Sequence, residues 1–286
     1  MINDVLVKPL GGITPGSDTP AAIRARPGGA AANQAAWMAH LGAAVTFAGR
    51  VGAGDAGYHG RELTRVDGQV SADTGSIVIM VAPDGERTMF TDRAANTRLR
   101  QDDLPASLLD DADVLHLTGY TFCEPPLLEV ALWLLDQARA RDLAITVDPG
   151  SAAFLARMEP GAFLRWTEGA AVCFPNRDEA AVLVGDADPV TMASRLASHY
   201  GVVALKLGRA GCILAVAGQA PVRIPAVPVQ AVQDTTGAGD AFCGAFMSRW
   251  LARGPDPQTA DLVDAAEFAA GIAASVVTRF GARPPG

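Results

Sequence analysis

Residues 234–242, DTTGAGDAF, carry the strongest chemical signal in the sequence. Two glycines with a small residue between them allow a tight turn, and an amphipathic helix follows. The free N–H groups of a helix's first turn, together with the helix dipole, favour a bound phosphoryl group. Asp240 lies in that turn, where a carboxylate can accept the proton of a hydroxyl that attacks phosphorus. The run predicts a phosphoryl-transfer site, although residues 237–240 alone would also fit a capped helix start.

Two further motifs contain side chains that could bind polar groups. Gly28 and Gly29 precede an expected helix that carries Asn33 in its first turn, so backbone and amide groups there could bind sugar hydroxyls. Asn176 and Glu179 follow an apolar run and share a helix face, from which they could hold waters of a hydrated Mg²⁺. The spacing of this second pair fits a capping box equally well, and a turn with a helix start would explain the first motif.

The sequence lacks the motifs of several other kinds of nucleotide and metal site. The phosphate-binding GxxxxGK[ST] loop is absent, and the Gly28-Gly29 motif does not fit the dinucleotide fingerprint GxGxxG. The four histidines show no zinc spacing. The four cysteines are far apart, and three lie in apolar runs, which predicts buried, reduced thiols and a cytoplasmic protein.

These motifs must be positioned by an α/β framework. Four short apolar runs, about 30 residues apart, alternate with helical stretches such as 127–141, which is the period of a βαβ unit. Continuous apolar runs suit strands that are buried on both faces of a parallel sheet. Polar residues and glycines follow each run, and ligands bind at the carboxyl edge of such sheets. The runs are residues 114–117, 144–147, 171–174 and 202–205.

A second, smaller sheet is predicted near the amino terminus. Residues 5–7, 23–26, 76–82 and 86–91 are β-type runs, and Pro83-Asp84-Gly85 is a turn signal between the last two. We expect an antiparallel sheet attached to the main body. A further β-type stretch, 227–232, is expected just before the phosphoryl-transfer motif.

Length and charge narrow the possible partners. A chain of 286 residues allows one large domain or two small ones, and 49% hydrophobic residues is a globular composition. The net charge of −8 argues against binding to nucleic acid or to an anionic membrane. No apolar run is long enough for a signal peptide or a membrane span.

In their order along the chain, these motifs resemble the signatures of the ribokinase/PfkB carbohydrate kinase family. The resemblance covers essentially the whole chain. It implies a ribokinase-like, Rossmann-type three-layer α/β sandwich as a single domain over 1–286, with a small β-sheet lid from about 4–26 and 74–93. It also implies transfer of the γ-phosphate of ATP, with Mg²⁺, to a sugar hydroxyl, and a homodimer through the lid.

The resemblance also assigns roles by position. Asp240 resembles the catalytic base, with an anion hole at Gly237, Ala238 and Gly239. The positions that resemble the family's nucleotide-binding residues are Asn176, Glu179 (near Mg²⁺ through water), Lys206, Gly208 and Gly211. The positions that resemble its sugar contacts are Asp4, Gly28, Gly29 and Asn33. Asp234 and Thr236 resemble the place where many relatives bind K⁺.

The chain departs from the family pattern at two points. Relatives begin with an apolar strand before the substrate-binding Asp, whereas here that strand is missing before Asp4. We expect either a true start upstream of Met1 or a sheet with one strand fewer. Relatives often carry an Asn beside the adenine, where this chain has Ala270, which bears on nucleotide preference.

Three alternatives follow for the function. A nucleoside kinase of the same fold would need stacking surface, for which Tyr120, Phe122 and Phe90 are available. A kinase for an acidic sugar such as 2-keto-3-deoxygluconate would need a facing cation, and Arg93 is the candidate. A non-catalytic ligand-binding homologue would explain the two departures, although the intact motif around Asp240 argues against it.

Overall fold

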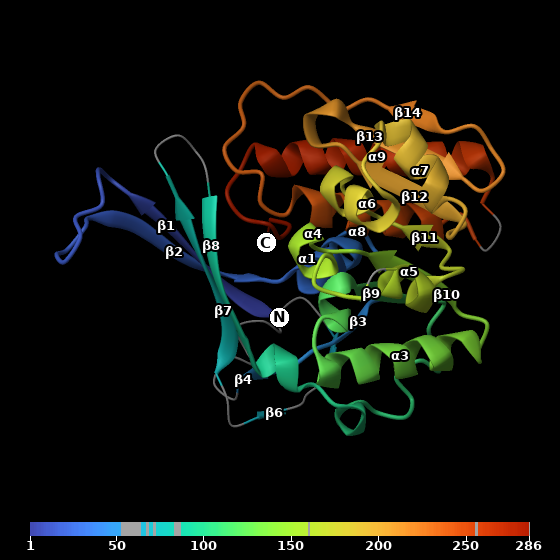
Figure 1. The fold of residues 1–286 in the computed structure, drawn as a ribbon, viewed down its shortest axis with the longest axis horizontal. Coiled ribbons are helices and arrows are strands. Elements are labelled where there is room, and N and C mark those ends of the chain that lie inside the picture. The colour runs from blue at the N-terminus through green and yellow to red at the C-terminus, as the bar shows by residue number, and fades with distance from the viewer. Residues whose placement is uncertain are drawn as a thin grey trace.

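A computed structural model describes residues 1–52, 64–66, 69–70, 73–82, 87–159, 161–254 and 257–285. The expected turn at Pro83-Asp84-Gly85 lies outside these residues. Within them the predicted α/β class is confirmed, with a main body of sheet and helices and a smaller sheet beside it (Figure 1).

The main sheet has six strands in the order β14-β13-β12-β11-β10-β9. From β9 to β12 the strands are parallel, as expected, whereas β13 and β14 are antiparallel. The direction reverses because β12 and β13 are joined by a tight turn through η4 rather than by a crossover helix. The elements are β9 (Val114–Thr118), β10 (Ala144–Asp148), β11 (Val172–Cys173), β12 (Val202–Lys206), η4 (Gly208–Ala210), β13 (Cys212–Val216) and β14 (Val222–Ile224).

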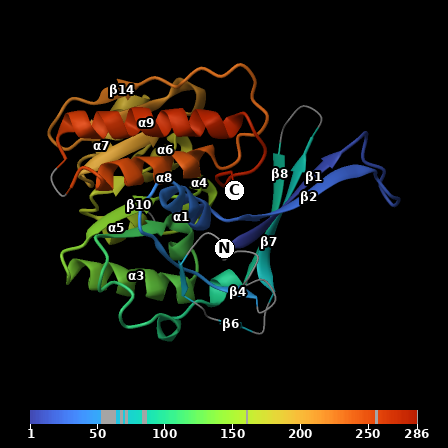
Figure 2. The ribbon, with the colours of Figure 1, turned by 180° about the vertical axis from the view of Figure 1, so that it is seen from behind.

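Helices cover both faces of this sheet, as Figures 1 and 2 show from opposite sides. One face packs against α3 (Pro125–Arg139), α5 (Ala162–Thr167), α6 (Arg177–Val184) and α7 (Pro189–Leu196). The other packs against α8 (Ala238–Leu251) and α9 (Thr259–Val277), with α1 (Ala30–His40) beside α8. The remaining elements of the body are α4 (Ala152–Leu155), η1 (Ala95–Arg98), η2 (Gln101–Asp103) and η3 (Gly119–Phe122).

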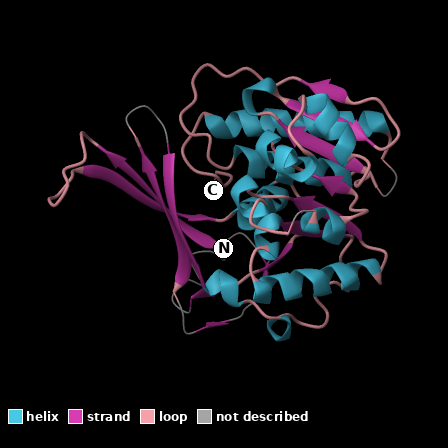
Figure 3. Ribbon diagram, in the orientation of Figure 1, coloured by secondary structure: helices cyan, strands magenta, loops and turns pink. Residues whose placement is uncertain are grey.

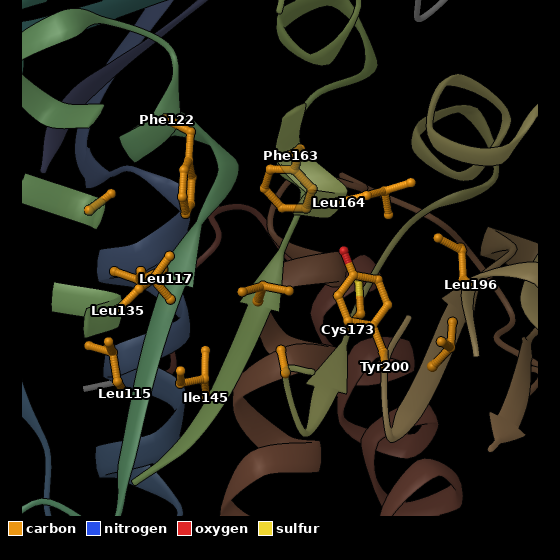
Figure 4. Close-up of a cluster of buried hydrophobic side chains, with 14 of the residues drawn as sticks. Leu115, Leu117, Phe122, Leu135, Ile145, Phe163, Leu164, Cys173, Leu196 and Tyr200 are labelled. Carbon is orange, nitrogen blue, oxygen red and sulfur yellow. The ribbon is translucent and has the colours of Figure 1, made fainter. Parts of the chain in front are cut away.

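Alternate residues of each buried strand enter separate hydrophobic clusters. On β12, Val203 and Leu205 join the cluster that Figure 4 shows in part, while Val202 and Ala204 join the cluster under α8 and α9. This alternation explains the continuous apolar runs in the sequence, because a strand covered on both faces must be apolar at every position.

The smaller sheet has the order β2-β1-β7-β8 and stands apart from the body in Figure 3. The expectation that it is antiparallel is wrong for one pair, since β1 and β7 run parallel. Those two strands are far apart in the chain, so they need not run antiparallel as a hairpin would. The strands are β1 (Ile2–Pro9), β2 (Ala21–Gly28), β7 (Thr74–Val81) and β8 (Arg87–Ala94).

Two minor sheets complete the described part of the chain. They pair β3 (Thr46–Ala48) with β5 (Thr64–Val66) and β4 (Val51–Gly52) with β6 (Gln69–Val70). The strand expected over residues 227–232 is wrong, because this segment forms an irregular surface loop. Val227 and Val232 are largely exposed there, so their β-type side chains have no sheet to pack against.

Helices α1 and α8 cross closely at Gly244. A Cβ at that position would lie 2.7 Å from both the Gln34 carbonyl oxygen and the Trp37 Cβ. Only glycine allows this approach without a shift of the backbone. The crossing brings the first turn of α1 against the first turn of α8.

Candidate active site

Polar residues at the carboxyl ends of neighbouring strands meet at one edge of the main sheet. Asp148 ends β10, Lys206 ends β12, and Asn176 forms a bridge with Lys206. Lys206 Nζ lies 3.0 Å from Asp148 Oδ2, and both side chains are largely buried. Burial alone would raise the pKa of Asp148, but Lys206 lowers it below its usual value. The pair is therefore ionised, with its charges beside the start of α8.

Asp240 lies in the first turn of α8, facing α1. Asn33 Nδ2 donates to its Oδ2 at 2.8 Å, and Gln34 Nε2 lies 3.3 Å from its Oδ1. Burial raises the pKa of Asp240 to about 7, and Asp148 adds to this, while Lys206 and the two amide hydrogen bonds oppose it. A carboxylate with a pKa near neutrality and both oxygens facing donors is suited to accept a proton.

The turn before Asp240 has the shape of an anion site. Gly237 precedes α8 with φ of 78°, and a side chain there would also collide with Ala282 of the C-terminal segment. Ala238 and Gly239 begin the helix, whose first N–H groups have no partner within the helix. A Cβ on Gly239 would lie 3.8 Å from Lys206 Nζ, so the lysine and the helix start face the same space.

Asn176 and Glu179 form the capping box that the sequence left open. Asn176 Oδ1 accepts from the Glu179 N–H at 2.9 Å, and Glu179 Oε2 accepts from the Asn176 N–H at 2.8 Å. Glu179 is 2% exposed, and burial raises its pKa to about 7. Glu179 Oε1 also accepts from Asn176 Nδ2 at 2.7 Å, and each carboxylate oxygen keeps a lone pair for a second hydrogen bond. Asn176 lines the adjoining cavity and Glu179 does not, so a hydrated Mg²⁺ held by this pair through water stays a prediction.

A cavity of about 360 Å³ lies beside this capping box. Asn176, Lys206 and Gly208 line it, as the nucleotide side of the site would require, together with Arg177 and Arg223. Gly211 does not line it, because its Cα faces the Ile224 carbonyl, where a side chain would collide. Gly211 instead closes the turn that leads into β13, with φ of 87°. The cavity is lined by three cationic side chains and one acidic side chain, Asp178, and this excess of positive groups suits a polyphosphate chain.

The predicted sugar contacts lie between the smaller sheet and α1. The Asp4 carboxylate rests against Gly28, where any side chain would collide with it, and Gly29 is the N-cap of α1 with φ of 94°. Burial raises the pKa of Asp4 to about 6, opposed by the nearby Arg283. Asn33 joins this group to the phosphoryl-transfer motif through its hydrogen bond to Asp240.

Asp234 and Thr236, the predicted K⁺ ligands, are hydrogen-bonded to each other. Asp234 Oδ1 accepts from the backbone N–H of Thr236 at 2.9 Å and from its hydroxyl at 2.7 Å. Gly281 N lies 3.4 Å from Asp234 Oδ2, which ties this loop to the C-terminal segment. The oxygens at this loop are of the type that K⁺ prefers, and K⁺ binding here stays a prediction.

The residues that the alternatives require are mostly engaged elsewhere. Phe122 is 2% exposed and stacks on Trp166, and Phe90 is 58% exposed on the smaller sheet. Arg93 donates to Glu124 at 3.1 Å and to the Tyr120 carbonyl at 2.7 Å. These contacts give Arg93 a place between the smaller sheet and η3.

The structure adds residues that the sequence did not single out. Gln34 Nε2 donates to Asp148 Oδ2 at 2.9 Å, and Cys243 Sγ lies 3.2 Å from the same oxygen. Arg283 Nε lies 3.4 Å from Asn33 Oδ1 and brings a cation to the sugar side. The position of Asp148 just after an apolar run was the available signal. Nothing local marks Gln34, Cys243 or Arg283.

Three predictions about the whole chain can be compared with the described residues. All four cysteines are free, and three are buried, as expected. No cluster of three or more His, Cys, Asp or Glu side chains suited to a metal occurs in the described ranges. None of the helices that the structure describes is both long and apolar enough to cross a membrane.

Comparison with known proteins gives matches along almost the whole chain. The model of the pfkB family carbohydrate kinases matches residues 3–285. A ribokinase of Mus musculus is 31% identical over 86% of this chain and 77% of the mouse protein.

Solved structures resemble the fold closely. The adenosine kinase of Sinorhizobium meliloti superposes with a TM-score of 0.84 at 23% identity, covering 99% of this chain and 93% of that one. The Arabidopsis thaliana ribokinase complexed with ribose and ATP has a TM-score of 0.77 at 23% identity, covering 98% and 91%. The chain therefore has the ribokinase-like α/β fold.

Proposed function

Since this chain belongs to the PfkB family of carbohydrate kinases, a group of phosphotransferases that act on hydroxyl groups, we propose that it transfers the γ-phosphate of ATP to a sugar hydroxyl. The observation that carries the proposal is the placement of Asp240. Its carboxylate is held by Asn33 at the amino end of α8, beside the glycine turn that faces Lys206. Base and anion site thus share one space.

The chemistry follows from this arrangement. The acceptor oxygen forms a bond to the γ-phosphorus as the bond to the β-phosphate oxygen breaks and ADP leaves. Asp240 takes the hydroxyl proton. The N–H groups at Gly237, Ala238 and Gly239, with Lys206 nearby, stabilise the charge on the transferring group. Bound Mg²⁺ would neutralise phosphate charge, with Asn176 and Glu179 holding its waters.

A neutral or acidic sugar is favoured over a nucleoside because two of the three aromatic residues available for stacking are not at the acceptor side. Phe122 is buried in the core, and Phe90 belongs to the sheet face opposite Asp4, whereas Tyr120 lies near Asp240 and is the residue on which a nucleobase could stack. The cation that an acidic acceptor requires is present as Arg283 beside Asn33, whereas Arg93 is held by Glu124. Arg283 therefore favours a sugar acid as the second candidate.

The proposal is tested by ADP release against a panel of pentoses, hexoses, sugar acids and nucleosides, with and without K⁺. We expect turnover with a sugar or sugar acid and none with nucleosides. Turnover only with nucleosides would move the chain to the nucleoside kinases. No turnover with any acceptor would favour a binding protein.

The pH dependence should follow the ionisation of Asp240. Because the base must be ionised and its pKa is raised to about 7, kcat/KM should fall tenfold per pH unit below that value. The fall arises because a protonated Asp240 cannot accept the proton of the acceptor hydroxyl. The measurement is kcat/KM for the best acceptor across the acid range at saturating ATP. A flat profile down to about pH 5 would contradict Asp240 as the base.

We also propose that the smaller sheet is a lid and that its outer face forms a homodimer. Asp4, Leu6 and Ile79 point toward the body, where they line a small cavity with Gly281 and Ala282. Alternation along the strands turns the other face outward. This outer face carries the apolar residues Val5, Val7, Ile23, Val78, Met80 and Phe90, and polar residues Ser76, Thr88 and Asp92 border them. Such a face favours burial against a second copy.

Replacing Phe90 by aspartate should convert the dimer to a monomer, because it places a charge on the outer face, on the edge strand β8 beside Val78. Sedimentation equilibrium of the variant and the parent protein measures the change. Leu10→Asp is the matched control, since Leu10 is 74% exposed and lies beyond the end of β1. A monomeric parent protein would refute the dimer.

A further inference from the structure

A chain of buried hydrogen bonds connects the strands beneath the active site to Asp240. His116 Nε2 lies 2.6 Å from Gln34 Oε1, and Gln34 Nε2 faces Asp148 Oδ2 at 2.9 Å and Asp240 Oδ1 at 3.3 Å. Gln34 is fully buried in α1. The amide therefore spans from a strand of the sheet to the carboxylates, without access to bulk water.

The surroundings of Gln34 determine which way its amide points. An ionised carboxylate can only accept hydrogen bonds, and Asp148 is kept ionised by Lys206. The amide nitrogen must therefore face Asp148 and Asp240, because an oxygen placed there would meet oxygen. The amide oxygen is then left facing His116.

This orientation decides the protonation of the histidine ring. An amide oxygen only accepts, so Nε2 of His116 must carry the hydrogen. Burial lowers the pKa of His116 to about 4, and the ring is neutral near pH 7. Its Nδ1 then accepts from the Thr146 hydroxyl, 2.8 Å away, and is a better acceptor for that one proton than the Met247 sulfur at 3.4 Å. Thr146 is directly opposite His116 in the pairing of β9 with β10, so this contact is built into the sheet.

We propose that His116 is a positioning residue for Asp240, because its Nε2–H holds the Gln34 amide with the nitrogen toward the carboxylates. The inference rests on the proposed role of Asp240 as the base. Without this donor the buried amide oxygen has no partner, and the amide can shift toward another donor at the expense of its long 3.3 Å contact with Asp240, while it keeps its bond to Asp148. Asp240 would lose a donor, and its ionised form would become less stable.

The other groups that face Asp240 do not orient the Gln34 amide, so they do not replace His116. Asp148 on β10 disfavours its ionised form and Lys206 on β12 favours it, while Tyr120 and Cys243 are neutral near pH 7 because their own pKa values are raised by burial. Asn33 binds the second carboxylate oxygen. Among the residues that the structure describes, Gln34 is the amide side chain that contacts both Asp148 and Asp240.

The tautomer of His116 tests the proposal without any substrate. Nitrogen NMR of protein labelled at histidine distinguishes a neutral ring protonated at Nε2 from one protonated at Nδ1. The signal of His116 is identified by its loss in His116→Gln. We expect the Nε2–H tautomer, unchanged between about pH 5 and pH 8. An Nδ1–H ring, or a ring that titrates in that range, would overturn the proposal.

Two variants test the consequence for Asp240. His116→Leu removes the donor, whereas His116→Gln offers an amide N–H in its place. We expect the carboxyl pKa of Asp240, followed by carbon NMR and assigned with Asp240→Asn, to rise by about one unit in the leucine variant and to return toward the parent value in the glutamine variant. Equal values in both variants would contradict the proposal. If the leucine variant does not fold, the tautomer of the parent protein decides.

Kinetics separate this inference from the proposed function. With an acceptor found in the panel, the acid limb of kcat/KM in His116→Leu should shift upward by the same amount, a loss of about tenfold below the pKa. Recovery is expected at alkaline pH, which a general loss of structure would not give. If no acceptor in the panel is phosphorylated, the proposed function is contradicted. The NMR result does not depend on turnover, because it reports only the tautomer of the His116 ring.

Discussion

Replacing Asp240 by asparagine is expected to lower kcat by about 10²- to 10⁴-fold, the usual contribution of a general base. The amide has nearly the same shape and cannot take the hydroxyl proton. Asn33 can still donate to the amide oxygen, and the weaker contact at 3.3 Å from Gln34 is the one that suffers. The fold should therefore survive. Single-turnover ADP release with the best acceptor measures the loss.

The control for this variant is another aspartate. Asp136→Asn on α3 changes a side chain that is 76% exposed and far from the site in the fold, so its kcat should equal that of the parent protein. ATP binding to Asp240→Asn, measured by calorimetry, should stay near the parent value. A folded Asp240→Asn variant with near-normal phosphoryl transfer would show that another group is the base.

Replacing Lys206 by methionine is expected to destabilise the protein by about 3 kcal/mol near pH 7, because it leaves a buried carboxylate without its counter-charge. Asp148 keeps hydrogen bonds from Gln34 and from the Gly150 N–H, both at 2.9 Å, so the low end of the usual range applies. Urea unfolding measures the change in the free energy of unfolding. Turnover should fall as well, since Lys206 also faces the anion turn.

Acid should reduce this difference in stability. Burial raises the pKa of Asp148 once Lys206 is gone, so the variant's carboxyl takes up a proton at higher pH and loses its penalty. Adding Asp148→Asn to Lys206→Met should restore most of the loss for the same reason. Lys8→Met, at an exposed lysine, is the control. A loss below about 1 kcal/mol for Lys206→Met would mean that the pair is not a charged pair.

The local part of the site was predictable from the sequence. Residues 234–242 predict a glycine turn before a helix, and in the structure Asp240 lies in the first turn of that helix. The polar residues after apolar runs, such as Asp148 and Lys206, meet at one edge because parallel strands end together. These features depend on residues near one another in the chain or on a repeated period.

The assignment of Glu179 illustrates a limit of local patterns. Its spacing from Asn176 fits both a capping box and a Mg²⁺ site, and the structure has the capping box. The strand expected over 227–232 failed because β-type residues form a strand only where a partner edge is available. The parallel pairing of β1 with β7 was missed because strand direction depends on the path of the intervening chain.

By itself, the sequence determined the α/β class, the glycine turn with its aspartate, and the strand ends that carry charge, because each is written in a short range of residues. Only the tertiary structure decided which groups act on that aspartate. Asn33 and Asp240 are 207 positions apart, and they meet because α1 and α8 cross at Gly244. Gln34 reaches the site from α1, His116 from β9 and Arg283 from the C-terminal segment. Such contacts depend on how whole helices and strands are placed, which no local pattern encodes.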